Sequence, residues 1–372
     1  MGPLHGIRVI EMAGIGPGPF AGMMLADMGA EVLRLYRADQ PPLLGDGGGF
    51  DVVSRGRVAS VPVNLKEESG REFVLRLAER ADALIEGFRP GVMERRGLGP
   101  DVLLERNERL VYGRMTGYGQ EGPLSTVAGH DINYISIAGA LGAIARQGER
   151  PLAPLNLVGD YGGGGMLLAF GVVCALLEAR TSGKGQVVDA AMVDGTAILM
   201  AIFHGLRAGG LWDDTPGTNV LDSGAHFYEV YETSDGRHIA VGALEPQFYA
   251  ELLRLLEIDQ GEMPQWDKAR WPEFKQRLAA LFKTRTRDEW AALLEPAEAC
   301  ATPVLGIAEA PSHPHVSARD TFVEHGGVVQ PAPAPRFSRT PGEIRSDDDG
   351  SADEVLRAWG LSGHELAAGR GT

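Results

Sequence analysis

Cysteine is almost absent from this chain, with only Cys174 and Cys300 among 372 residues. Two cysteines cannot hold a chain of this length together through disulfide bonds, so its stability must come from buried apolar surface. The N-terminus also lacks the basic and apolar stretches of a signal peptide. Both features predict a reducing, cytoplasmic location.

Long apolar runs are missing as well. The most apolar stretch, 166–177, has 12 residues and ends at Glu178. A stretch of this length is too short to cross a bilayer, so we expect a buried core helix and no membrane partner.

Positive charge is scarce, because 35 Lys and Arg residues face 50 Asp and Glu residues, for a net charge of −15. A net negative charge of this size repels polyanions, so we expect no nucleic-acid partner. A local site for a small anion remains open, because basic residues gather in the first 100 positions. They include Arg34, Arg37, Arg55, Arg57, Lys66, Arg89, Arg95 and Arg96.

Several signature motifs are also absent: the chain has no HExxH, CxxC or GxSxG sequence. Three histidines near the C-terminus are separated by prolines and lack a fourth ligand, so we predict no metal site. The glycine-rich segment 14–18 fails the dinucleotide fingerprint, since Pro17 and Pro19 have no N–H to offer a pyrophosphate. The alternative is a rigid strand-to-helix turn, and we expect no NAD, FAD or other cofactor.

What the sequence does contain is an alternation of short apolar strands with helical patterns in its first 115 residues. Such an alternation predicts an α/β fold with a Rossmann-like, doubly wound parallel sheet. The expected strands are 8–11, 31–35, 60–63, 83–85 and 110–115, and the expected helices are 20–28 and 67–80.

The chain is predicted to contain two domains. A large α/β domain covers 1–205, a linker covers 206–224, and a small α+β domain covers 225–315. The small domain should hold a hairpin turning at 233–236, helices at 248–256 and 271–282, and a third helix opened by a capping box at Thr286. The return segment, 316–372, carries an acidic turn at 347–349 and a helix at 353–359, and its part from 325 onward completes the large domain.

Three polar residues are candidates for chemistry, and each has a plainer alternative. His130 lies in the sequence Gly-His-Asp-Ile-Asn-Tyr, although a lone histidine is more often structural. Asp160 precedes four glycines, 162–165, at a helix start, where it is either a reactive acid or an N-cap. Glu245 stands before Pro246 and, taken alone, is a capping acid.

At these residues the chain resembles the α-methylacyl-CoA racemase branch of the family III CoA-transferases, of the CaiB/BaiF type. The segment 128–134 matches the hallmark of the branch in seven consecutive residues. The similarity runs from Leu4 to Trp359 and includes the segments 88–93, 154–160, 183–187, 222–225, 241–249 and 301–305. One departure is Val58, which stands where the family usually has a basic residue.

The resemblance implies a CoA-binding large domain, an interlocked homodimer and active sites built between subunits. His130 and Asp160 match the two acid/base groups, and Glu245 matches the partner of His130. The segments that match the acyl-CoA contacts comprise Arg37, Val63, Asn64, Leu65, Lys66, Arg89, Gly129, Asp131, Ile132, Asn133 and Tyr134.

The implied reaction interconverts (2R)- and (2S)-2-methylacyl-CoA, and the residue types suit it. A thioester α-proton is weakly acidic, so its transfer needs a base, an acid and stabilisation of the enolate oxygen, for which we expect the N–H groups of 162–165. One alternative is a CoA-transferase in which Asp160 forms an acyl anhydride. Another is a non-catalytic acyl-CoA carrier. The sequence leaves the acyl chain open.

Overall fold

The structure is a computed structural model that describes residues 1–39, 52–345 and 351–362. The acidic turn predicted at 347–349 lies outside these residues. The chain divides into two compact units. Unit 1 comprises Met1–Ala138, Leu155–Met200 and Asp320–Thr372, and unit 2 comprises Gly139–Pro154 and Ala201–Arg319.

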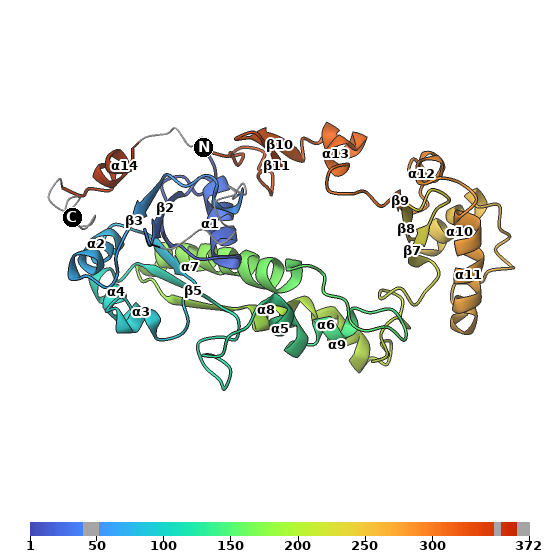
Figure 1. Ribbon diagram of the computed structural model, residues 1–372, viewed down its shortest axis with the longest axis horizontal. Helices are drawn as coiled ribbons and strands as arrows, with labels where there is room; N and C mark the ends of the chain where they lie inside the picture. The colour runs from blue at the N-terminus through green and yellow to red at the C-terminus, as the bar shows by residue number, and fades with distance from the viewer. Residues whose placement is uncertain (40–51, 346–350, 363–372) are drawn as a thin grey trace. The chain divides into compact units, whose positions relative to one another are not determined.

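Unit 1 is built on a sheet of six parallel strands in the order β3-β2-β1-β4-β5-β6 (Figure 1). The strands are β1 (Arg8–Met12), β2 (Glu31–Tyr36), β3 (Ala59–Pro62), β4 (Ala83–Glu86), β5 (Val111–Thr116) and β6 (Val187–Ala191). This order, with helical connections, is that of a dinucleotide-binding Rossmann sheet. The predicted doubly wound fold is therefore confirmed.

Helices cover both faces of this sheet. The helices of unit 1 are α1 (Pro17–Asp27), α2 (Glu68–Ala78), α3 (Val92–Arg95), α4 (Pro100–Arg106), α5 (Asp131–Ile137), α7 (Leu167–Ser182), α8 (Met192–Leu199) and α14 (Ala352–Ala358), with a 3-10 turn η2 (Val52–Ser54), a π-helix η3 (Leu157–Met166) and a hairpin of β10 (Phe322–His325) and β11 (Val328–Pro331).

The two layers are visible in the alternation along β1. Val9 packs with α1 and α7 in one apolar core, and its neighbour Ile10 packs with α2 and α14 in the other. Alternation of this kind follows from the period of two in a β-strand. A strand covered on both faces is expected to be largely apolar. In β1 this holds for Val9, Ile10 and Met12, whereas Glu11 is a buried acid and Arg8 is half-buried.

The apolar helix of unit 1 is longer than the run seen in the sequence. The π-helix η3 continues into α7, and together they span Leu157–Ser182, 26 residues. Among the described residues this helix alone is long and apolar enough to cross a membrane, and half of its most apolar window is buried inside the protein. Leu168 and Val172 pack against the sheet, as expected of a core helix.

Unit 2 combines an antiparallel sheet, in the order β7-β8-β9, with helices. Its elements are α6 (Ala140–Ala143), α9 (Ala201–Ala208), β7 (Tyr228–Glu232), β8 (His238–Gly242), α10 (Pro246–Leu255), η4 (Lys268–Arg270), α11 (Trp271–Phe282), α12 (Arg287–Leu294), β9 (Ala301–Pro303), η5 (Ala310–Ser312) and α13 (Pro314–Ala318). Phe227, Ile239, Phe274 and Trp290 lie in its core. The units partition the chain differently from the predicted boundaries, since 139–154 and 201–205 belong to unit 2.

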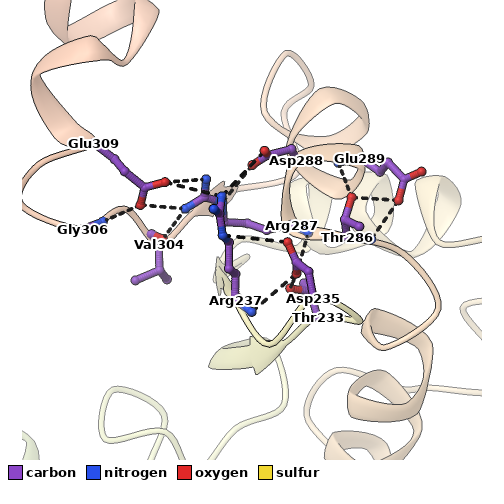
Figure 2. A network of polar contacts seen from close by, with 10 residues as sticks. All are labelled: Thr233, Asp235, Arg237, Thr286, Arg287, Asp288, Glu289, Val304, Gly306 and Glu309. Atoms are coloured by element: carbon purple, nitrogen blue, oxygen red, sulfur yellow. Dashed lines mark hydrogen bonds and ion pairs between the residues drawn. The ribbon is translucent and has the colours of Figure 1, made fainter.

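A polar network centred on Arg287 holds the start of α12 in unit 2 (Figure 2). The predicted capping box is present, with the carboxylate of Glu289 accepting from the backbone N–H of Thr286 at 2.8 Å. The buried guanidinium of Arg287 donates to Glu309 at 2.9 and 3.0 Å and to the carbonyl of Val304 at 3.2 Å. These contacts attach the segment after β9 to the start of α12.

Candidate active site

The candidate site lies at the carboxyl edge of the sheet in unit 1. The strand order reverses between β1 and β4, and the segments after these strands are 13–16 and 87–91. In open α/β sheets, ligands bind in the crevice that forms at such a switch point. Gly16, at the end of the first segment, has φ +68° and faces Asp160, since a Cβ added there would lie 3.4 Å from Oδ2.

His130 is exposed immediately before α5. Its backbone N–H donates to Oδ1 of Asn133 at 3.0 Å, and its carbonyl accepts from the backbone N–H of Asn133 at 2.8 Å. These bonds hold the start of α5 and leave the imidazole of His130 exposed. Asn133 therefore has a structural contact in addition to its predicted role beside acyl-CoA.

Asp160 lies in the first turn of the π-helix η3 and not at an N-cap, which is Asn156. Its Oδ2 accepts from Nδ2 of Asn156 at 3.0 Å. π-Helical turns are rare and often occur at functional sites. Asn156 was not predicted from the sequence, although its position four residues before Asp160 is the spacing at which helical neighbours meet.

The four glycines after Asp160 do not supply free N–H groups. They lie inside η3, where backbone N–H groups bond to carbonyls five residues earlier. A Cβ on Gly164 would lie 2.9 Å from Cγ of Met192, and one on Gly165 would lie 2.7 Å from Cδ1 of Phe20. The predicted enolate donors at 162–165 are therefore wrong. The glycines are needed because α1 and α8 pack directly against η3.

Asp131 connects the two candidate acid/base residues. It is the first residue of α5, is 5% exposed, and its Oδ2 accepts from the backbone N–H groups of Gly159 at 2.7 Å and Asp160 at 2.8 Å. N–H groups in the first turn of a helix have no carbonyl partner within that helix, so another group must accept from them. Asp131 does this for η3. The structure thus brings His130, Asp131 and Asp160 together.

Burial is the main influence on the pKa of Asp160. It raises the pKa of Asp160, and the charge of Asp131 raises it further, while the bond from Asn156 and the charge of His130 oppose the change. Burial also raises the pKa of Tyr134 to about 12, so this hydroxyl stays protonated. The hydroxyl donates to the carbonyl of Gly129, and the ring packs edge-on against Tyr118 at 4.9 Å.

Arg89, in the segment after β4, is exposed and close enough to lower the pKa of Tyr134. Its segment is anchored by Glu86, whose carboxylate accepts from the backbone N–H of Phe88 at 2.7 Å and from Nε of Arg114 at 3.1 Å. Burial raises the pKa of Glu86 to about 7. Sequence analysis missed this pair, because neither residue stands in a recognisable motif.

The other predicted acyl-CoA residues follow β2 and β3. Arg37 is exposed and pairs with Asp39 at 2.9 Å. Asn64 and Lys66 are exposed, whereas Val63 is buried and Leu65 is half-buried. Ile132 is exposed at 47% on α5. The exposed basic residues lie at the carboxyl ends of parallel strands, the edge where anionic ligands bind.

Two further basic residues of this region point inward. Arg55 bonds to Asp27, to Oε1 of Gln330 and to the carbonyl of Pro331, and Arg57 pairs with Glu11. Both arginines are buried. Val58 is also in the core, at 9% exposure. These arginines therefore hold the fold of unit 1 and are not free to meet a phosphate.

Glu245 lies in unit 2, where it is exposed at the N-cap of α10. Its predicted partnership with His130 remains a prediction. Among residues 1–39, 52–345 and 351–362, no group of three or more His, Cys, Asp or Glu residues could hold a metal ion.

A doubly wound parallel sheet with candidate acid/base side chains at its switch point places the chain among the Rossmann-like α/β proteins. Within this class the chain belongs to CoA-transferase family III, whose model matches residues 4–348. It is 46% identical to mouse α-methylacyl-CoA racemase over 369 residues, covering 98% of this chain and 95% of the relative. It is 42% identical to the human α-methylacyl-CoA racemase over 370 residues, with the same coverage.

A solved structure supports the same family. The crystal structure of a CaiB/BaiF family protein from Brucella suis superposes with a TM-score of 0.78 at 26% identity, covering 96% of this chain and 99% of that one. The family predicted from the sequence is confirmed.

Proposed function

We propose that this protein is an isomerase that interconverts (2R)- and (2S)-2-methylacyl-CoA by 1,1-proton transfer. The observation that carries the proposal is the juxtaposition of His130 and Asp160, which come from different helices and are joined through Asp131. Two racemases more than 40% identical over nearly the whole chain support the same reaction class.

In one direction His130 removes the α-proton of the thioester. The C–H bond breaks, the N–H bond forms, and the electron pair moves to the carbonyl oxygen as an enolate. The imidazolium that results is a cation beside this enolate. Asp160 in its protonated form, which the raised pKa favours, then delivers a proton to the opposite face of the same carbon. The reverse direction exchanges the two roles, and the step needs neither metal nor redox cofactor.

Glu245 of the partner subunit orients His130 in the homodimer that we propose. An exposed apolar stripe on α7 supports such a dimer, because Phe170, Val173, Cys174 and Leu177 follow the i, i+3, i+4, i+7 spacing of one helix face. Phe170 is 66% and Leu177 is 68% exposed, which is unusual for such large apolar side chains in a monomer.

The CoA moiety is held by Arg37, Asn64, Lys66 and Arg89 at the strand ends. The charges of Arg37, Lys66 and Arg89 complement its phosphates in a chain whose net charge is −15. Cys174 and Cys300 are free thiols, which agrees with the cytoplasmic location that we propose.

The test is incubation with a (2R)-2-methylacyl-CoA in deuterated water, followed by NMR of the α-position. We expect deuterium at C2 together with loss of stereochemical purity, and absence of both would refute the proposal. The His130→Ala variant separates the remaining possibilities. It should abolish interconversion of the two epimers, whereas a CoA-transferase that uses Asp160 as nucleophile would still transfer CoA to a carboxylate, and a carrier would bind CoA esters without either reaction.

A further inference from the structure

The link between α5 and η3 depends on one carboxylate. Asp131 follows His130 directly in the chain, and its Oδ2 accepts from the backbone N–H groups of Gly159 and Asp160 at 2.7 and 2.8 Å. Movement of the first turn of η3 away from α5 would break both bonds. Asp131 therefore fixes the distance between the backbones that carry His130 and Asp160.

The neighbourhood is shaped around this contact. A Cβ on Gly159 would lie 2.6 Å from Oδ2 of Asp131 and 3.1 Å from Cγ2 of Ile135, so only glycine lets the carboxylate reach the helix end. The second oxygen of Asp131, Oδ1, is buried and has no hydrogen-bond partner within the described structure. A buried carboxylate with half of its acceptor capacity unused is costly, and such groups are rare in folded proteins.

We propose that Asp131 is a positioning residue of the proton-transfer site, which holds Asp160 in place through the backbone and acts on its carboxyl group through charge. The proposal rests on the racemase function above. It differs from the role that the family resemblance implies for Asp131, which is contact with acyl-CoA.

The groups that face Asp160 determine the direction of the electrostatic effect. They are Asp131 and His130 at the start of α5, Tyr134 one turn later, and Asn156 at the N-cap of η3, while Gly16 on the α1 side is uncharged. Of these, Asp131 is the anion, and it favours the protonated form of Asp160. Protonated Asp160 is the form that can deliver a proton to the enolate.

Asp131→Asn is the decisive variant, because an amide oxygen can still accept both N–H bonds while the charge is gone. We expect the pKa of Asp160 to fall, because the negative charge that raises it is removed. The carboxyl ¹³C signal of Asp160, assigned by its loss in Asp160→Asn, reports this value without any substrate. The limb of the kcat–pH profile that belongs to Asp160 should move by the same amount, with KM changed less than about twofold.

Asp131→Ala removes both the charge and the bonds, and its kcat should fall further than that of Asp131→Asn. Asp194→Asn is the matched control, since Asp194 is an exposed acid in the first turn of the neighbouring helix α8. An Asp131→Asn protein with an unchanged Asp160 pKa would overturn the proposal, as would one that loses acyl-CoA affinity at constant kcat. If the wild-type protein shows no α-proton exchange, the proposed function fails, and the ¹³C titration still decides the role of Asp131.

Discussion

Arg57 and Glu11 form a buried ion pair at the centre of unit 1. Nη2 and Nε of Arg57 lie 2.5 and 3.0 Å from Oε2 of Glu11, and both side chains are less than 5% exposed. Gly22 on α1 makes room for the pair, since a Cβ there would lie 2.0 Å from the same carboxylate oxygen. The pair joins β1 to the segment before β3, and Nη2 of Arg57 also donates to the carbonyl of Pro19 on α1.

Replacement of Arg57 by Leu should lower the free energy of unfolding by about 3–5 kcal/mol, because the buried carboxylate of Glu11 loses its closest cation. Arg76→Leu is the control, since Arg76 pairs with Glu72 at the surface and should cost less than about 1 kcal/mol. Urea denaturation of both variants measures the difference. Equal losses would mean that the buried pair is no stronger than the exposed one.

Gly195 and Gly205 should respond in opposite ways to alanine. A Cβ on Gly195 would lie 1.8 Å from the carbonyl oxygen of Gly163, so Gly195→Ala must separate α8 from η3 and should cost more than about 3 kcal/mol. At Gly205, within α9, nothing lies within 4 Å, and alanine should stabilise the helix by up to about 1 kcal/mol. Thermal denaturation checks the pair, and a stable, fully active Gly195→Ala protein would contradict this packing.

The stability of unit 1 should depend on the protonation of Glu86. Its pKa is raised from 4.5 to about 7 by burial, so the folded protein holds this proton more tightly than the unfolded chain does. The resulting stabilisation is complete below about pH 4.5 and is lost as the pH rises to about 7. Glu86→Gln imitates the protonated form and lacks this dependence.

Relative to wild type, Glu86→Gln should therefore gain about 1–3 kcal/mol between pH 5 and pH 8. Urea denaturation at the two pH values measures this gain, with exposed Glu105→Gln as a control for general pH effects. A difference between Glu86→Gln and wild type that is the same at both pH values would be inconsistent with a buried, proton-binding Glu86.

Mixed dimers test the proposed sharing of the site. Consider a dimer of one His130→Ala chain and one Glu245→Gln chain. If each site takes both residues from the same subunit, neither site is intact. If each site takes His130 from one subunit and Glu245 from the other, one of the two sites has both residues intact. Random mixing of the two inactive proteins should then restore about a quarter of the wild-type rate. Absence of any recovery, with mixed dimers demonstrated by mass spectrometry, would place His130 and Glu245 of one chain in the same site.

Local patterns were sufficient for most elements of the fold. The strands predicted near Arg8, Glu31 and Ala83 are present, and their ends differ from the prediction by less than two residues. Short apolar runs between turn residues usually form buried strands in an α/β chain. The helix at 271–282 has the predicted bounds, since one apolar face alternates with charged residues. The capping box at Thr286 was also predictable, because its residues are close together in the sequence.

The candidate site was less predictable. His130 and Asp160 stood out through a family resemblance, but the bond from Asn156, the cap supplied by Asp131 and the anchoring of the 87–91 segment by Glu86 all need coordinates. The glycines at 162–165 illustrate the difficulty, since the same residues would suit an open anion site or a close helix contact. Only the positions of α1 and α8 show that the glycines serve a close helix contact.

The sequence by itself determined the doubly wound sheet, the family and the candidate acid/base residues, because these depend on short-range periodicity and on motifs that are contiguous in the chain. Only the tertiary structure decided which charged side chains are buried. Arg55 and Arg57 look like anion ligands in the sequence, but Asp27 and Glu11 neutralise them inside unit 1. The physical reason is that the energy of a charge depends on what surrounds it, and residues distant in the sequence supply those surroundings.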